Sequence, residues 1–263
     1  MITSRQNPLV KEFVQLHRAK GRIQQQALLL EGTNLLDLAI AQGYRLTTVC
    51  YTEAWAAQNP ERSPQIQAQG DRVEVVSEAV LGAMTTTVHP DGVVAVLPRH
   101  YLPWQAPAQL SLGVILAQVQ DPGNVGTIIR TAAAVAADGV WCSGDSVAPD
   151  HPKVLRASAG MALGLPVIQT EDLAALIRAY QDQGVQVVAT AMDAPQTYWD
   201  WDWRSPSLIL LGNEGAGLPP VLQNLANGRV AIPQGRGVES LNVAISAALL
   251  LYEAQRQRQT FST

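Results

Sequence analysis

The second half of the chain alternates short, almost wholly apolar runs with longer amphipathic stretches, and this pattern constrains the fold more than any other feature. Apolar runs without polar alternation are typical of strands buried on both faces, as in parallel sheets. The amphipathic stretches between them have the spacing of helices that cover such a sheet. Residues 112–263 are therefore predicted to form an α/β domain around a parallel sheet.

The boundaries of these elements follow from the same pattern. We expect strands at residues 112–119, 140–142, 185–190, 208–211 and 229–232, with a further one at 166–169. We expect helices at residues 125–137, 153–157, 172–183, 220–225 and 241–257.

Residues 1–98 repeat the alternation on a smaller scale and predict a separate, compact α/β unit. Its helices are expected at residues 7–20 and 34–41 and from residue 77, and its strands at 27–30, 46–51, 73–76 and 93–97. Three prolines then fall within residues 98–107. Because proline removes backbone donors and favours extended chain, residues 99–111 are predicted to be a linker, with a packed loop as the alternative.

The charge of the chain is unevenly distributed. The net charge of −4 argues against a nucleic-acid binder when the chain is taken as a whole. Residues 1–22, however, hold five basic residues against one acidic residue, which can create a local positive field. A solvated helix face is the alternative interpretation. The five basic residues are Arg5, Lys11, Arg18, Lys20 and Arg22.

Several classes of protein are disfavoured by what the sequence lacks. Cys50 and Cys142 stand alone, so a disulfide framework and a zinc site are not expected, and a reducing cytoplasm is the simplest location. The four histidines have no metal-ligand spacing, so no metal site is predicted. The apolar runs are too short to cross a membrane, and the N-terminus lacks the apolar core of a secretory signal. Neither a P-loop nor a dinucleotide-binding glycine motif is present.

Unusual loops follow three of the predicted strands, at the sheet edge where ligands of parallel sheets gather. In the first, residues 120–130, Pro122 and Gly123 predict a tight turn before a helix that begins near Asn124. Arg130 follows almost two helical turns later and would lean back towards the strand end. The alternative is that Asn124 is only a helix N-cap and Arg130 a surface residue.

The second and third loops also carry polar side chains. Residues 212–220 contain three glycines around Glu214, and a carboxylate between glycines after an apolar strand indicates a ligand site as readily as a solvated turn. Residues 233–242 precede an apolar helix, with Ser240 as the expected N-cap. Asn242 would then lie within the first turn, where an amide has little structural purpose, so this polar pair indicates a site.

Taken together, the three loops resemble the ordered motifs of the SPOUT family, in its branch of SpoU/TrmH-type RNA 2′-O-ribose methyltransferases. The motifs are Asn124-x-Gly126-x-x-x-Arg130, then residues 211–218 (LGNEGAGL), then Ile232-Pro233 with residues 240–244 (SLNVA). Residues 152–160 and 90–95 agree with the same family. The N-terminal pattern ITS…NP…K within residues 2–11, and Glu31-Gly32, are similar to that family's substrate-binding domain.

The resemblance implies a fold, a cofactor and an assembly. The fold is α/β, a C-terminal SPOUT parallel sheet with a trefoil knot (an exception to the usual threading rules), plus a smaller N-terminal α/β RNA-binding domain. The implied cofactor is S-adenosyl-L-methionine, and the implied assembly is a homodimer in which Arg130 lies near the partner subunit's cofactor. By motif position the cofactor-binding residues are Gly212, Ile232 and Leu241, and the catalytic residues are Asn124, Arg130, Glu214, Ser240 and Asn242.

The implied activity is 2′-O-methylation of a ribose in RNA, and the two-domain layout favours ribosomal RNA. A transfer RNA methyltransferase and an inactive RNA-binding protein of the same fold are the alternatives, and an unrelated nucleotide-binding α/β enzyme is a third. We hypothesise that Arg130 clamps a neighbouring phosphate and stabilises the developing alkoxide, because a guanidinium hardly ever deprotonates. The general base would then be a phosphate oxygen of the RNA. The expected RNA contacts are the five basic residues of the N-terminus together with Arg156.

Overall fold

A computed structural model describes residues 1–259, and these form two compact units. The first unit consists of Met1–Pro103 and Asp150–Gly164, and the second of Trp104–Pro149 and the described residues from Leu165 onward. The segment Asp150–Gly164 thus packs with the N-terminal residues although it lies far along the chain. The division into domains at 1–98, 99–111 and 112–263 stays a prediction.

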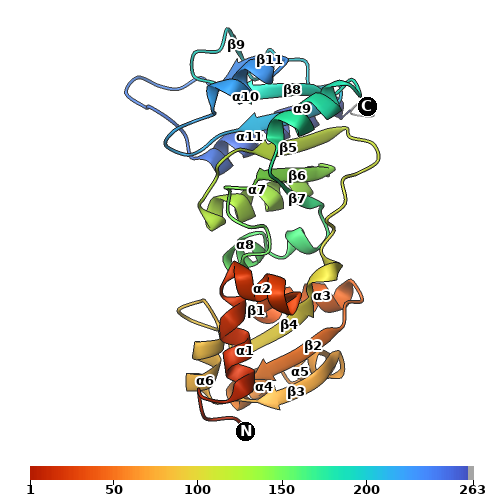
Figure 1. Ribbon diagram of the computed structural model, residues 1–263, viewed down its shortest axis with the longest axis vertical. Coiled ribbons are helices and arrows are strands. Elements are labelled where there is room, and N and C mark those ends of the chain that lie inside the picture. The colour runs from red at the N-terminus through yellow and green to blue at the C-terminus, as the bar shows by residue number, and fades with distance from the viewer. Residues whose placement is uncertain (260–263) are drawn as a thin grey trace. The chain divides into compact units, whose positions relative to one another are not determined.

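The second unit is built on a sheet in which every neighbouring pair of strands is parallel, as the apolar runs predict (Figure 1). The order across this sheet is β7-β6-β5-β10-β8-β11-β9. Its strands are β5 Leu112–Leu116, β6 Gly139–Ser143, β7 Val167–Thr170, β8 Gln186–Thr190, β9 Gln196–Thr197, β10 Ser207–Leu211 and β11 Gly228–Ala231. Its helices are α7 Pro122–Ala134, α9 Leu173–Gln181, α10 Pro220–Leu225 and α11 Val243–Arg258.

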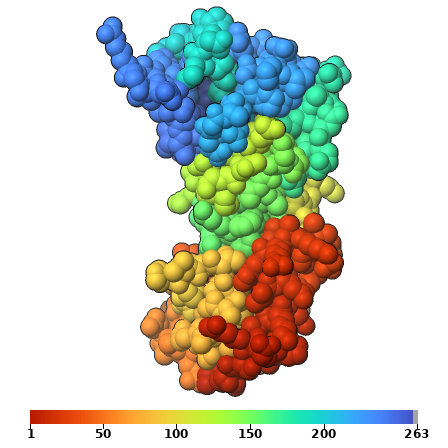
Figure 2. Space-filling model, turned by 60° about the vertical axis from the view of Figure 1, so that its left-hand side comes forward, coloured from red at the N-terminus to blue at the C-terminus, as the bar shows by residue number. Residues whose placement is uncertain are grey.

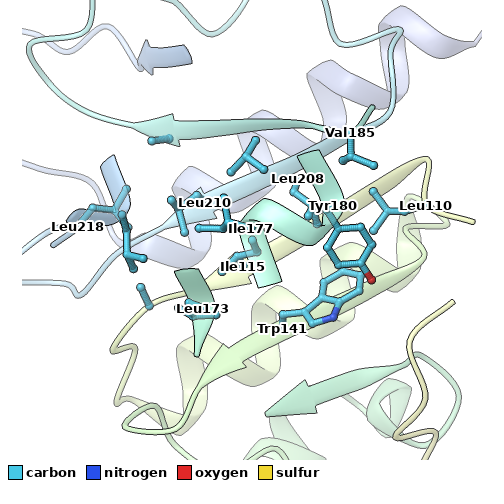
Figure 3. Packing of buried hydrophobic residues seen from close by; sticks show 14 residues of the cluster. Leu110, Ile115, Trp141, Leu173, Ile177, Tyr180, Val185, Leu208, Leu210 and Leu218 are labelled. Atoms are coloured by element: carbon cyan, nitrogen blue, oxygen red, sulfur yellow. The ribbon is translucent and has the colours of Figure 1, made fainter. Parts of the chain in front are cut away.

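Helices cover both faces of this sheet. On one face, α9 and α10 pack over Trp141, Leu208 and Leu210 in the apolar cluster drawn in Figure 3. On the other, α7 and α11 pack against each other and against β6 and β10. Successive side chains of a strand point to opposite faces of the sheet, and here both faces are covered by helices. The strands β5, β6 and β10 are therefore buried along their whole length. No helix among residues 1–259 is long and apolar enough to span a bilayer.

The first unit has a smaller, mixed sheet of order β1-β4-β2-β3, in which β4 runs antiparallel to β1 and β2 while β2 and β3 are parallel. Its strands are β1 Ala27–Glu31, β2 Leu46–Tyr51, β3 Gly70–Val75 and β4 Val93–Pro98. Its helices are α1 Pro8–Leu16, α2 Ala19–Gln25, α3 Thr33–Ala41, α4 Glu53–Gln58, α5 Arg62–Ala68, α6 Glu78–Met84 and α8 Pro152–Ala157, with 3-10 turns at Arg99–Tyr101 and Met161–Leu163.

The helix predicted at residues 7–20 is in fact two helices, α1 and α2. Arg18 adopts an extended conformation (φ −107°, ψ 142°) and interrupts the helical hydrogen bonds. A Cβ atom on Gly21 would lie 1.9 Å from the carbonyl oxygen of Gln15, so glycine permits α2 to fold back tightly on α1. The pattern also missed α4 and α5, because helices of two turns or fewer carry too little apolar periodicity to be detected.

Arg22, predicted as an RNA contact, is instead part of the core of the first unit. Arg22 is 1% exposed, and its Nη2 donates to Asp150 Oδ1 at 3.0 Å. Nη1 donates to the carbonyl oxygens of Leu16 and His17, at the end of α1. The prediction for Arg22 was therefore wrong, since a guanidinium enclosed in this way is not available to a phosphate.

Both cysteines are buried free thiols. Burial raises the pKa of Cys50 and of Cys142 to about 12, so at pH 8 almost none of either thiol is ionised. Because the thiolate is the reactive form, we expect iodoacetamide to alkylate both residues about 10³-fold more slowly than a free cysteine of ordinary pKa. Mass spectrometry of the native and the guanidinium-denatured protein measures this difference. Alkylation of the native protein at the rate of an exposed thiol would contradict it.

Candidate active site

A cavity of about 520 Å³ lies at the carboxyl ends of β8, β10 and β11. A hollow between the cyan and blue segments is visible near the top of Figure 2. The three residues predicted to bind the cofactor all line this cavity, and so do two of the predicted catalytic residues. These five are Gly212, Ile232, Leu241, Glu214 and Ser240. The second and third loops therefore share one pocket, as the sequence predicts.

The charged side chains that line the cavity are all acidic: Asp193, Glu214 and Glu239. No lysine, arginine or histidine is among its lining residues, and Asp193 is paired with Arg229 at 3.5 Å outside the lining. Apolar walls come from Leu211 and Val230 at the ends of their strands. This lining suits a ligand that combines a flat or apolar part with a net positive charge.

A chain of side-chain hydrogen bonds connects the three loops at this edge of the sheet. Asn124 Nδ2 donates to Glu214 Oε1 at 2.9 Å, and Asn242 Nδ2 donates to Asn124 Oδ1, also at 2.9 Å. Three residues from distant parts of the sequence thus form one polar group, and Glu214 places this group at the cavity. Asn124 uses both its amide nitrogen and its amide oxygen in these contacts, so the orientation of its amide is fixed, and it holds one oxygen of the Glu214 carboxylate.

Two expectations about helix caps were wrong. Asp121 is the N-cap of α7, with its side chain accepting from Asn124 N at 2.9 Å, so Asn124 lies within the first turn. Asn242, and not Ser240, is the N-cap of α11, and its Oδ1 accepts from the backbone N–H groups of Ala244 and Ile245. The amide of Asn242 therefore has a structural purpose as well as its bond to Asn124.

The loop that carries Glu214 is closed by its own backbone. Asn213 and Gly217 exchange two backbone hydrogen bonds, and Gly217 has a φ of +70°, which favours glycine. A Cβ on Gly212 would lie 2.4 Å from the carbonyl carbon of Gly217. Glycine at position 212 is thus required for the turn to close, and the turn presents Glu214 to the cavity.

Arg130 is not brought into the cavity by this single chain. It lies on the exposed side of α7, is absent from the cavity lining, and has no hydrogen bond or ion pair within residues 1–259. Its side chain is consequently available to a partner molecule. Within residues 1–259 Arg130 makes no hydrogen bond or ion pair at the strand end of its own chain, so no contact supports the prediction that it leans back to that point.

The remaining predicted RNA contacts all belong to the first unit. Lys11, Arg18 and Lys20 are exposed, and Arg5 is exposed with its Nε donating to the carbonyl oxygen of Ala79. The guanidinium of Arg156 pairs at 2.6 Å with Glu31, whose side chain is 2% exposed, so much of its charge is neutralised within the unit. Asn213 and Gln118 join the first and second loops by a hydrogen bond, although neither was predicted as a site residue. Asn213 lies inside the second motif, which is the one sequence signal that points to it.

Comparison with known proteins agrees with this geometry. The family model described as SpoU rRNA Methylase family matches residues 111–252, and the MRM3-like substrate binding domain matches residues 7–95. An uncharacterized tRNA/rRNA methyltransferase of Synechocystis sp. is 47% identical over 100% of this chain and 96% of its own length. A 23S rRNA (guanosine(2553)-2′-O)-methyltransferase of Bacillus subtilis is 29% identical over 95% of this chain and 97% of its own.

Among solved structures, an AdoMet-bound rRNA methyltransferase from Sinorhizobium meliloti superposes with a TM-score of 0.84, at 33% identity and 98% coverage of both chains. The SpoU methyltransferase AviRb from Streptomyces viridochromogenes, in complex with AdoMet, has a TM-score of 0.85 at 26% identity and covers 96% of this chain. The SpoU model spans more than half of the sequence and includes every predicted catalytic and cofactor-binding residue. This chain therefore belongs to the SpoU rRNA methylase family.

Proposed function

We propose that this protein transfers a methyl group from S-adenosyl-L-methionine to a ribose 2′-hydroxyl of ribosomal RNA. The observation that carries the proposal is the hydrogen-bonded group of Asn124, Glu214 and Asn242 at the rim of an acid-lined cavity. The names of the relatives support both the cofactor and the class of RNA. We also propose that the second unit has the trefoil knot that the family resemblance implies.

The residues present fit the proposed cofactor. S-adenosyl-L-methionine is a net cation, because its sulfonium and ammonium outweigh its carboxylate. The cavity lining has no basic side chain and three carboxylates, one of which, Asp193, is paired with Arg229. When bound, the cofactor supplies an electrophilic methyl group. Gly212, Ile232 and Leu241 would hold it, with backbone groups of the two loops facing the adenosine. The apolar ends of β10 and β11 exclude water from that side.

The side chains around the cavity would then align the acceptor. Methyl transfer to a hydroxyl is an in-line displacement that depends chiefly on holding both groups at near-attack distance. Glu214, fixed by Asn124, would orient the incoming ribose or its loop, with Ser240 beside it. Arg130 would hold the neighbouring phosphate and stabilise the alkoxide as the hydroxyl loses its proton to a phosphate oxygen.

The first unit would bind the RNA. Arg5, Lys11, Arg18 and Lys20 are exposed cations that can contact phosphates, and such binding weakens as the salt concentration rises. An RNA substrate and two unpaired thiols together favour the cytoplasm as the location.

We also propose that two copies of the chain form a homodimer through the face that α7 and α11 share. Ile245 and Tyr252 on α11 are 53% and 52% exposed, and the helical spacing places Leu249 between them on the same side. An exposed apolar stripe of this kind is typical of an interface. The dimer would bring Arg130 of one subunit to the cavity of its partner.

The test is methylation of ribosomal RNA transcribed in vitro, with S-adenosyl-L-methionine labelled in the methyl group. We expect label in the RNA and resistance of one phosphodiester bond to alkaline hydrolysis, which locates a 2′-O-methyl ribose. Calorimetry with the cofactor alone provides a separate measurement. Absence of cofactor binding would overturn the proposal and favour an inactive RNA-binding protein; label on transfer RNA alone would overturn the ribosomal substrate.

A further inference from the structure

Asn213 uses both polar atoms of its side chain, and they serve different loops. Its Oδ1 accepts from the backbone N–H groups of Gly215 and Ala216, each at 2.9 Å, and so closes the turn that carries Glu214. Its Nδ2 donates at 2.8 Å to the carbonyl oxygen of Gln118, in the loop between β5 and α7. One side chain therefore ties together the two loops that supply Glu214 and Asn124.

The hydrogen bond from Asn213 reaches the loop at Gln118, a residue with an unfavourable backbone conformation. It has a φ of +60°, a left-handed conformation that is disfavoured for residues other than glycine. Two further hydrogen bonds hold it, from its N–H to Ser143 Oγ at 2.8 Å and from its Nε2 to Asp145 Oδ2 at 2.9 Å. Such conformations persist only where the surroundings over-determine them. The Gln118 conformation also explains why β5 ends at Leu116 instead of continuing to Val119.

We infer that Asn213 is a positioning residue for methyl transfer: it fixes the loop before α7 against the Glu214 turn, so that Asn124 meets Glu214. This inference rests on the proposed function. Asn213 lines the cavity, but the effect proposed for it passes through Gln118 and the start of α7 and requires no contact with the substrate. A small displacement of an aligned group is enough to slow a reaction that depends on near-attack geometry.

The variant Asn213→Asp separates the two roles of the side chain. It keeps an oxygen that accepts from Gly215 and Ala216, but it replaces the donor to Gln118 with a second oxygen that faces a carbonyl. We expect kcat on transcribed ribosomal RNA to fall about 10²-fold, the cost of a misplacement of about 1 Å. Asn213 also lines the cavity, so the variant adds one negative charge to an already acidic lining. The KM for the cationic S-adenosyl-L-methionine should therefore not rise, since the turn and the cavity walls remain.

Asn227→Asp is the matched control in the same unit. Asn227 Oδ1 accepts from Val187 N at 2.8 Å and from Gln181 Nε2 at 2.9 Å, and the residue is not part of the cavity lining. The same isosteric change there should leave kcat and KM unaltered. Hydrogen–deuterium exchange of residues 117–124, measured without cofactor or RNA, should accelerate in Asn213→Asp and not in Asn227→Asp.

The outcomes are distinct. Wild-type kcat and wild-type exchange in Asn213→Asp would overturn the inference. A loss of kcat together with a raised KM and a lowered unfolding midpoint would also overturn it, because Asn213 would then only stabilise the fold. If the wild-type protein methylates no ribosomal RNA, the proposed function fails, while the exchange experiment still decides whether Asn213 holds the two loops.

Discussion

The variant Arg130→Lys is expected to lose about 10²- to 10³-fold in kcat on ribosomal RNA, the usual effect of removing one preorganised donor from a developing oxyanion. Lysine keeps the positive charge but loses the planar fork that holds a phosphate with two parallel hydrogen bonds. The stability of the protein should hardly change, because Arg130 is exposed and makes no hydrogen bond within residues 1–259. Single-turnover methylation and thermal unfolding measure the two effects.

Arg178→Lys is the control, since Arg178 is likewise an exposed arginine, on α9 at the opposite face of the sheet. Its kcat should equal that of the wild type. A wild-type rate in Arg130→Lys would remove the phosphate clamp from the mechanism.

The same residue tests the proposed dimer. Arg130→Ala and Glu214→Gln chains, each inactive alone, should recover up to about a quarter of the wild-type activity when mixed with free subunit exchange, because half of the dimers then contain one intact site of two. No recovery, with mixed dimers present by native mass spectrometry, would place Arg130 and Glu214 in the same subunit's site.

The largest effect on stability is expected from Asp150→Asn. The Asp150 side chain is 3% exposed and accepts from Arg22 at 3.0 Å and from Arg99 at 3.0 Å. Removal of its charge leaves the Arg22 guanidinium buried without a counter-ion, and breaking a buried pair in this way costs about 3–5 kcal/mol in the free energy of unfolding. Urea unfolding of the full chain measures the loss.

Asp71→Asn provides the comparison. Asp71 pairs with Arg45 at 2.6 Å, but both side chains are more than half exposed, so its loss should change the free energy of unfolding by about 1 kcal/mol at most. Equal effects of the two variants would show that Asp150 does not stabilise the first unit through its charge. In the double variant Arg22→Met/Asp150→Leu, an apolar pair replaces the ions, and most of the stability should return.

Much of the second unit could be predicted from local patterns. Strands buried on both faces have no polar alternation, and the helices between them have a period of their own, so the parallel sheet follows from residues 112–263 alone. The positions of Gly212 and Glu214 directly after a buried strand also predicted that they line a shared cavity, because the carboxyl ends of parallel strands meet at one edge.

The caps and the short helices could not be predicted in the same way. Asp121, Ser240 and Asn242 are all capable N-cap residues, and the choice among them depends on where neighbouring loops allow a helix to begin. In the third loop the N-cap is Asn242, whose amide also donates a hydrogen bond to Asn124 at the cavity rim. A residue with two structural partners is indistinguishable, in the sequence, from one that has none.

Sequence patterns alone predicted the α/β layers, the polar loops that follow the strands and the family to which the chain belongs. They could not reveal that Asp150 encloses Arg22 and keeps it from RNA, or that Asn213 joins the Gln118 loop to the Glu214 turn, because these contacts form only in the folded chain. The physical reason is the separation along the chain of the residues that produce each property. Apolar periodicity is a local property that a short window records, whereas the burial of a charge and the partner of an amide depend on residues about a hundred positions away, which meet only when the chain folds.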